Sequence, residues 1–497
     1  MLKPLISKKA TLDDERGVTI VLVALAMIAI ISMAALSVDV VTLYLAKEEA
    51  QRSADEAALA AARILSLSGI TGDPQNGKGH WSSICGPSGI AYQAAQAVVR
   101  QNTVSNVVPS TVTVTYSAGG QNGMASNTDC TTLAGNTAFG VNPLVTVNLI
   151  RPGLPTFFAR IWGRTGQTIT ATATAEAFNP ADSGASGNQT SGAITPVEPW
   201  CVKPWVVPNQ DPKPMSDGTF CTSTPCPHFV DPATGDIQNK GITIGGYADN
   251  GVIGEKFWLV PDCSTGGGCD LLGGVQPKAN YIPGSNPPPT PNLLFVPNQT
   301  GTTVSAVPSC TTGDDFNLAV VGCDQPTNYS CGVASANTLD LSTNPITPSI
   351  NGVQCLTAQK DNNDLTQSTG QDYLKYDSTS PANFGRPVAY PFQILAGNKT
   401  PLVLQGGLPH DTPITSSNSI VAIPIYDSDA VTLSTANAAP SVTFVGFLQV
   451  FINAVDNKGD ISVTVLNVAG CGNGSKGTPG NPVTGTSPVP IRLVTPP

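Results

Sequence analysis

The sequence has little charge and almost no histidine, and these shortages exclude whole classes of protein. Only 12% of its 497 residues are charged, the formal net charge is -10, and there are three histidines. No basic run occurs after the first 16 residues. The chain therefore lacks the clustered Lys and Arg with which proteins displace counterions from nucleic acid, and we expect no nucleic-acid partner.

Catalytic patterns are missing as well. His80, His228 and His410 each sit among turn residues. No GxSxG elbow marks a serine that one of them could activate. The glycine-rich run "GGGCDLLGG" lacks the Lys-Ser/Thr pair of a phosphate-binding loop. We expect no catalytic residue and no cofactor, and we interpret the chain as non-enzymatic, with an anchored secreted hydrolase as a remote alternative.

Metal-binding patterns are equally incomplete. The run "DNNDLTQSTGQD" at residues 361–372 lacks the central glycine and the terminal glutamate of an EF-hand loop. The sequence places Cys221, Cys226 and His228 close together, but it has no second CxxC pair that would complete a zinc site. We therefore expect no metal site.

Helix-breaking residues are absent from one long stretch. Between Val18 and Ser68 there is neither proline nor glycine, and the first such residue is Gly69. Residues 18–38 also carry no charge. At about 1.5 Å per residue they extend roughly 31 Å, which is the thickness of a bilayer core. We predict a transmembrane helix over residues 17–38 that continues unbroken through residues 39–68.

The distribution of basic residues predicts how this helix is oriented. Basic side chains precede the apolar run, at Lys3, Lys8, Lys9 and Arg16, whereas the first ones beyond it are Lys47 and Arg52. This bias places the N-terminus in the cytoplasm and residues from Asp39 onward outside. A removable signal peptide is the alternative, with a small-x-small site at residues 35–37. The apolar run exceeds the roughly 7–15 residues of a signal core, so we expect a retained span.

A stripe of small apolar residues follows the span, with one member every three or four positions. Its members are Leu43, Ala46, Ala50, Ala54, Ala57, Ala61 and Leu65. This spacing places them on one face of a helix. Alanine buries little area but lets another backbone approach closely. The stripe either covers the protein's own β domain or packs against copies or related subunits, and both interpretations can hold.

Residues 16–62, "RGVTIVLVALAMIAIISMAALSVDVVTLYLAKEEAQRSADEAALAAA", resemble the N-terminal segment of TadG-like proteins of the Flp (Tad) pilus-assembly system. That pattern has Arg-Gly before the span, Val-Asp at its end, Tyr-Leu-Ala, and then Gln before an Ala-Asp-x-Ala-Ala-Leu-Ala-Ala run. The matching positions are Asp39, Tyr44, Gln51, Asp55, Ala57, Ala58 and Leu59. Residues 155–178, "PTFFARIWGRTGQTITATATAEAF", are similar to the stretch that closes the first module of TadE/TadG-type proteins.

The resemblance implies a pseudopilin-like pilus-assembly subunit in the bacterial inner membrane, with a single span and its C-terminal bulk periplasmic or extracellular. It implies other Tad/Flp pilus or secretion components as partners. The apolar run adds the lipid bilayer, and the alanine-rich helix offers self-association with further copies of the chain. An adhesin or surface binding module on the same anchor is the alternative. We expect the interaction residues of the helix to be Asp39, Tyr44, Ala50, Gln51, Ala54, Asp55, Ala57, Ala58 and Ala61. Asp39 and Asp55 would set the register of the helix against its partner, either through charges on the partner or as caps.

The resemblance also marks Gly17 as a processing position. Pilins of this system carry a glutamate five residues after the processing glycine, and Leu22 occupies that place here. This departure argues against cleavage after Gly17.

All twelve cysteines follow the apolar run. They are Cys85, Cys130, Cys201, Cys221, Cys226, Cys263, Cys269, Cys310, Cys323, Cys331, Cys355 and Cys471. An even number on one side of a membrane segment predicts disulfides in an oxidising compartment, with buried free thiols or a metal site as alternatives. The connectivity cannot be deduced, and a short-loop pair such as Cys263–Cys269 is one guess.

The rest of the chain indicates strands and turns. We predict a short helix at residues 90–100, one or two helical turns within 155–163, and alternating strands at residues 110–116, 144–150 and 167–178. Later strands are predicted at residues 401–405, 419–427, 441–455 and 460–470, and the last two form a hairpin around "DNKGD". The segment "PIRLV" near the end offers a final strand.

The expected fold class is therefore α+β and membrane-anchored. A single transmembrane helix continues into a pilin-like helix with an antiparallel sheet, and a disulfide-rich, mainly-β domain follows. The expected boundaries are a basic cytoplasmic tail (1–16), the span (17–38), the alanine-rich helix (39–68), a pilin-like α+β module (69–178), a linker (179–199), the Cys-rich β domain (200–470) and a flexible tail (471–497).

Overall fold

The computed structural model describes most of the N-terminal third of the chain and the main elements of the remainder. The described residues are 15–72, 76, 79–118, 127–134, 139–140, 142–163, 166–179, 197–212, 226–239, 241, 251–263, 292–300, 314–322, 329, 337–359, 370–376, 388–389, 391–405, 407–434, 436–471, 483–485 and 487–494.

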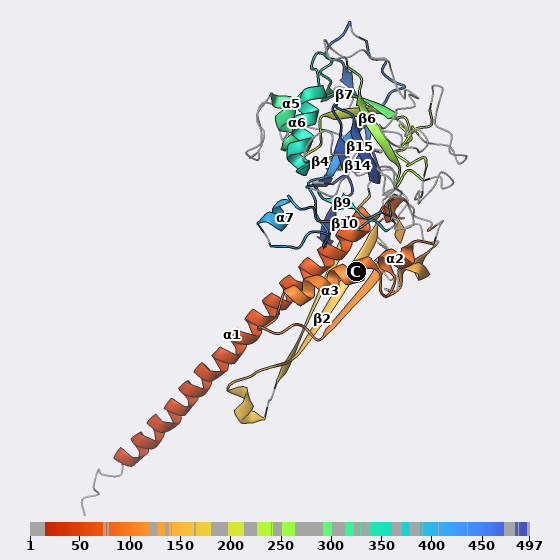
Figure 1. The fold of residues 1–497 in the computed structure, drawn as a ribbon. Helices are drawn as coiled ribbons and strands as arrows, with labels where there is room; N and C mark the ends of the chain where they lie inside the picture. The colour runs from red at the N-terminus through yellow and green to blue at the C-terminus, as the bar shows by residue number, and fades with distance from the viewer. Residues whose placement is uncertain are drawn as a thin grey trace, which may run out of the picture.

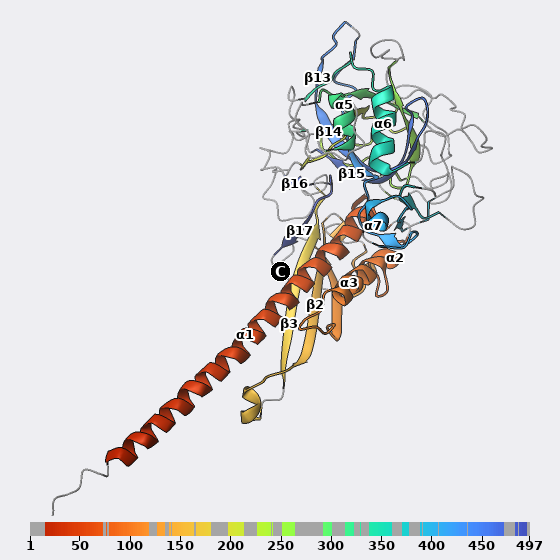
Figure 2. The same ribbon diagram turned by 60° about the vertical axis from the view of Figure 1, so that its left-hand side comes forward.

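One uninterrupted helix, α1 (Glu15–Leu67, 53 residues), carries both the apolar run and the alanine-rich segment. The predicted continuity between them is confirmed. Within the described part of the chain, α1 is the one helix long and apolar enough to cross a membrane. It ends where Gly69 adopts a φ of 71°, a conformation that glycine tolerates and that stops the helical path. The N-terminal part of α1 projects away from the rest of the molecule (Figures 1 and 2).

The C-terminal part of α1 lies on a four-stranded antiparallel sheet with the order β1-β2-β3-β17. The strands are β1 (Thr111–Ala118), β2 (Pro143–Leu154), β3 (Gln167–Ala177) and β17 (Ile491–Val494). α1 packs across β2 and β3, and α3 (Ile90–Gln101) lies beside α1. We call this unit, from Asp39 of α1 through the sheet, the proximal module. The helix and the three strands predicted between residues 90 and 178 are confirmed.

Shorter helical segments complete the proximal module. They are η2 (Ile70–Gly72), α2 (Trp81–Cys85), η3 (Cys130–Leu133) and η4 (Ala159–Trp162). η4 supplies the helical turn predicted within residues 155–163. A disulfide joins Cys85 of α2 to Cys130 of η3, and both cysteines are buried.

The chain returns to the proximal module at its C-terminal end. β17 pairs with β3, with Ile491 opposite Ala177, so the final strand offered by "PIRLV" is confirmed. This strand lies inside the segment expected to be a flexible tail. β16 (Val483–Gly485) pairs in parallel with β4 (Val197–Pro199), which falls in the expected linker. Figure 2 shows β17 running beside β3.

The second unit, which we call the distal module, is built around a closed barrel with the order β12-β14-β15-β6-β7-β5. Its strands are β5 (Trp205–Pro208), β6 (Lys256–Pro261), β7 (Asn292–Pro297), β12 (Ile420–Tyr426), β14 (Phe444–Val455) and β15 (Ile461–Gly470). The predicted β14–β15 hairpin is confirmed. Closure leaves no unpaired strand edge in the barrel.

Small elements surround the barrel. α5 (Asp315–Val321) and α6 (Ile346–Thr357) pack together on its outer side (Figure 1). The short strands are β8 (Asn337–Thr338), β9 (Tyr373–Leu374), β10 (Ile394–Leu395), β11 (Pro413–Ile414) and β13 (Ser441–Val442). The strand predicted at residues 401–405 is wrong, because α7 (Pro401–Leu404) occupies this segment. Proline suits the first turn of a helix, where its missing N–H leaves no bond unmade.

The two modules are joined by a polar contact at the end of α1. Asn467 of β15 donates hydrogen bonds to the Ser66 carbonyl (2.8 Å) and to the Thr71 hydroxyl (2.9 Å). The Ser66 hydroxyl donates to the Val489 carbonyl at 2.7 Å. All of these side chains are buried, so α1 is fixed to the barrel as well as to its own sheet.

None of the cysteines in the described part of the chain is a free thiol. The pair Cys85–Cys130 is the disulfide whose two ends both lie in that part. Cys221, Cys269, Cys310, Cys323 and Cys331 lie outside the described residues, so the guessed pair Cys263–Cys269, of which only Cys263 is described, is not tested. The wider disulfide network stays a prediction.

Candidate functional site

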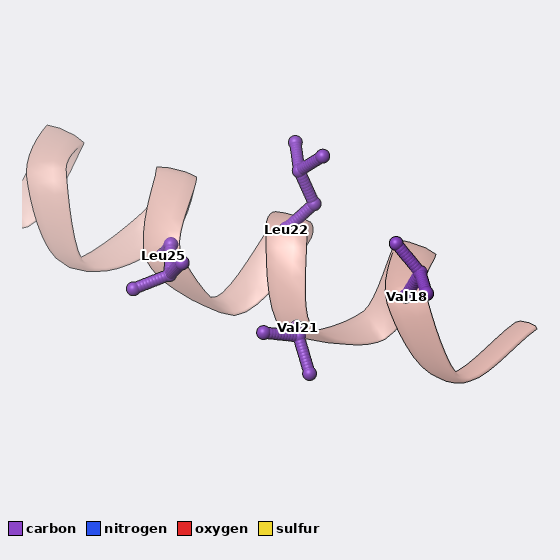
Figure 3. Close-up of a pocket in the computed structure, with 4 residues that line it drawn as sticks. All are labelled: Val18, Val21, Leu22 and Leu25. Atoms are coloured by element: carbon purple, nitrogen blue, oxygen red, sulfur yellow. The ribbon is translucent and has the colours of Figure 1, made fainter.

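The protruding half of α1 presents an apolar surface on every side. The large apolar side chains between Val18 and Val38 are 47% to 72% exposed. Figure 3 shows Val18, Val21, Leu22 and Leu25 with no other element drawn against them. Their i, i+3, i+4, i+7 spacing places them on one side of the helix. Leaving such a surface in water is unfavourable, because removing apolar area from water stabilises a protein by about 25 cal/mol per Å².

Gly17 lies in the first turn of α1, immediately before this surface. Leu22, five residues later, is exposed and belongs to the apolar face.

The alanine stripe lies inside the protein. Ala50, Ala54, Ala57, Ala58 and Ala61 are all fully buried in the core of the proximal module. The sheet and α3 fill the space that these small side chains leave. These five residues were expected to meet a partner, and here they meet the chain's own sheet. A partner could reach them only by displacing that sheet, so the first interpretation of the stripe is the one the structure supports.

Gln51 and Asp55 tie α1 to the backbone of β3. The side-chain amide of Gln51 donates to the Thr172 carbonyl at 3.0 Å and to the Asp55 carboxylate at 2.9 Å. Asp55 therefore orients the side chain of Gln51 toward the sheet. Lys47 reaches the Thr170 carbonyl in the same way.

Asp39 holds a loop from the far end of the sheet. Its two carboxylate oxygens accept hydrogen bonds from the backbone N–H groups of Phe157 (2.9 Å), Phe158 (3.0 Å) and Ala159 (2.7 Å). Desolvation alone would raise the pKa of Asp39, but these three bonds outweigh it and hold the pKa below its usual range. Asp39 thus caps a turn of its own chain, 118 residues away.

The loop held by Asp39 presents exposed aromatic rings. It connects β2 to β3, and Phe157 is 62% and Phe158 37% exposed. In both ribbon views this end of the hairpin reaches toward the protruding half of α1 (Figures 1 and 2). The sequence offered one sign of these exposed rings: a Phe-Phe pair stands between two predicted strands, in a chain with only 6% aromatic residues.

Exposed apolar residues of α1 lie at the same level. Val40, Val41 and Leu45 are exposed, and Tyr44 is 64% exposed. The Tyr44 hydroxyl bonds to Glu48, and the bond and the charge of Glu48 raise the pKa of the phenol. Of the expected interaction residues, Tyr44 is the one that is exposed, while Gln51 and Asp55 are half-buried and the others are buried. We call the set Val40, Val41, Tyr44, Leu45, Phe157 and Phe158 the collar.

The histidines stand apart from one another. His228 Nε2 lies 3.0 Å from the Asp429 carboxylate, and His410 Nδ1 lies 3.0 Å from Asp411. In the described residues, no group of three or more His, Cys, Asp or Glu is placed to hold a metal ion.

Lys203 is a buried lysine whose burial the sequence did not lead us to predict. Lys203 is 4% exposed, and its ammonium donates to the Gly322 carbonyl at 2.8 Å. Burial lowers its pKa to about 7. The available sign in the sequence was its setting, because Lys203 stands alone as a charge within the apolar run WCVKPWVVP.

Residues 17–63 match the family model of the putative Flp pilus-assembly TadE/G-like proteins. The match covers the apolar run and most of the alanine-rich segment, and it confirms the resemblance seen over residues 16–62. Comparisons with curated proteins and with solved structures gave no match.

Proposed function

We propose that the protein is a membrane-anchored, non-enzymatic subunit of an Flp/Tad-type pilus or secretion assembly. Residues 17–38 of α1 form its single span, the N-terminus lies in the cytoplasm, and both modules lie outside the inner membrane. One observation carries the proposal. The helix that matches the pilus-assembly family is apolar and uncovered in its first half and is the spine of a folded module in its second half.

The geometry suits a part that must hold other components at a set distance from the membrane. α1 has no break between the span and the proximal module, and Asn467 fixes its end to the barrel. The barrel therefore cannot swing freely on a linker at this point. An assembly subunit needs such rigidity, whereas an adhesin needs mainly an exposed binding surface.

The buried alanine stripe redirects the search for subunit contacts. Surfaces available to partners include the apolar face of the span, with Val18, Val21, Leu22 and Leu25, and the exposed Tyr44. Close packing between spans in lipid depends on shape, since lipid tails are as apolar as leucine. We place self-association and contacts with other spans on this face.

The Cys85–Cys130 bridge supports the outward placement of the proximal module. Disulfides persist in the periplasm and on cell surfaces, while the cytosol keeps thiols reduced. A periplasmic or extracellular location of the remaining cysteines would follow from the same topology.

Gene deletion followed by complementation tests the proposal. The full chain should restore surface pili or secretion in a deletion strain, and its tagged form should co-purify Tad/Flp components from solubilised membranes. A matched control replaces residues 17–38 with an unrelated apolar span of equal length, which keeps the anchor and changes the shape of its packing face. Normal pili in the deletion strain, together with lost adhesion, would refute the assembly role and favour the adhesin.

A further inference from the structure

We propose that the collar is a lipid-contacting surface. The β2–β3 loop rests at the boundary between the hydrocarbon core and the headgroups of the outer leaflet, and Asp39 sets its depth. This inference rests on the proposed function in one respect, because it requires α1 to span the membrane.

The level of the loop along α1 is fixed by Asp39. Its carboxylate binds three successive backbone N–H groups of the loop, so the loop cannot slide along the helix without losing all three bonds. Asp39 directly follows Val38, the last residue of the proposed span. The exposed rings of Phe157 and Phe158 are therefore held where α1 leaves the hydrocarbon core.

The length of the apolar surface agrees with this placement. Exposed apolar residues continue along α1 from Val18 to Leu45, and the first basic residue beyond them is Lys47. At 1.5 Å per residue, residues 18–38 extend roughly 31 Å, close to the roughly 30 Å of a hydrocarbon core, and residues 39–45 add roughly 10 Å, enough to cross one interfacial layer. The segment from Asp39 to Leu45 then crosses the headgroup layer.

The chemistry of the collar suits that layer. Amphipathic aromatic side chains such as Tyr44 favour the membrane–water interface. Arg160, on the same loop, is exposed, and its guanidinium matches the geometry of a lipid phosphate.

Asp39 is the one acidic group among these apolar residues. Its charge is compensated by the N–H groups of the loop, and its side chain is 2% exposed. A carboxylate near hydrocarbon needs such partners. The three hydrogen bonds that position the loop therefore also stabilise the charge of Asp39 at this depth in the membrane.

The occupant is lipid because the collar is continuous with the uncovered surface of the span. Val38, Val40 and Val41 follow one another along α1 and are all exposed, and the loop is bound to Asp39 at the same level. A bilayer that covers the first surface reaches the second. A protein partner at the collar is the competing outcome of the test below.

Site-specific photocrosslinking tests this inference. The full chain is placed in nanodiscs of phosphatidylethanolamine and phosphatidylglycerol, with p-benzoylphenylalanine in place of Phe157 or Phe158. Leu25 in the span is the positive reference. Leu404 in the distal module is the negative control, because it is 68% exposed but remote from α1's apolar half.

We expect phospholipid adducts at positions 157 and 158 as well as at 25, and no phospholipid adduct at 404. Adducts at 25 without adducts at 157 or 158 would overturn the inference and leave the span intact. No lipid adduct at 25 would overturn the span itself, and with it the proposed function. In native membranes, a protein adduct at 157 in place of lipid would refute the lipid assignment.

The depth-setting role of Asp39 has its own readout. Asp39→Ala should reduce the lipid adduct at 157 and leave the adduct at 25 unchanged. Asp55→Ala, on the same helix but away from the loop, is the matched control and should change neither. An adduct at 157 that survives Asp39→Ala would contradict this role.

Discussion

Replacing Gly69 with alanine probes the joint between α1 and the barrel. Gly69 has a φ of 71°, and a Cβ added there would lie 2.3 Å from Cγ2 of Ile253 and 2.9 Å from the Leu466 carbonyl oxygen. A left-handed conformation costs an L-residue roughly 1–2 kcal/mol. Overpacking a core costs about 1–3 kcal/mol more. We therefore expect Gly69→Ala to lower the free energy of unfolding by about 2–5 kcal/mol.

Gly153→Ala is the matched control for backbone strain. Gly153 has a φ of 70°, but no described atom lies within 4 Å of an added Cβ. Its cost should be limited to the roughly 1–2 kcal/mol of strain. Urea unfolding of the full chain in detergent, followed by tryptophan fluorescence, compares the two variants, and Trp81 and Trp205 report on the two module cores. Equal midpoints would refute the packed joint.

Three further variants test other parts of the account. Ala57→Leu should cost about 1–3 kcal/mol by overpacking the stripe, whereas Arg52→Leu on the exposed side of α1 should change the urea midpoint little; equal effects would contradict the buried stripe. Loss of the Cys85–Cys130 bridge, which spans 45 residues, should lower the free energy of unfolding by about 4 kcal/mol in the chain-entropy account, and unchanged unfolding would argue against that bridge. Burial lowers the pKa of Lys203 to about 7, so between pH 7 and 10 the unfolded chain holds a proton that the folded chain has lost. Stability should then rise with pH by up to about 1.4 kcal/mol per unit, and Lys203→Met should remove that slope in unfolding measured across this range.

Local features of the chain could be predicted from sequence because local residues decide them. The absence of proline and glycine from Val18 to Ser68 predicts one helix, and α1 is continuous. Alternating side chains predict β1, β2 and β3, since a half-buried strand has a period of two. The strand prediction for residues 401–405 was wrong because this short apolar run has no clear periodicity and Pro401 favours the first turn of a helix.

The partners of the helix could not be predicted, because they come from remote parts of the chain. A buried alanine stripe has the same spacing whether a sheet or another subunit covers it, and burial decides for the sheet. Asp39 finds its partners 118 residues away. The backbone N–H of Phe157 is one of these partners.

The pairing of strands that lie far apart along the chain could not be predicted from the sequence either. The barrel order β12-β14-β15-β6-β7-β5 joins strands that are distant along the chain. No local pattern specifies that β17 returns to the edge of β3. The contact of Asn467 with Ser66 and Thr71 follows from these closures.

The proposed function requires one helix whose first half remains in the bilayer while its second half forms the spine of an outer module. Intact-mass analysis of the mature chain, combined with alkaline carbonate extraction of membranes, measures this directly. The account predicts that residues 18–38 are present and that the chain stays in the membrane pellet. A mature chain that begins near residue 38 and is released into the soluble fraction would contradict it.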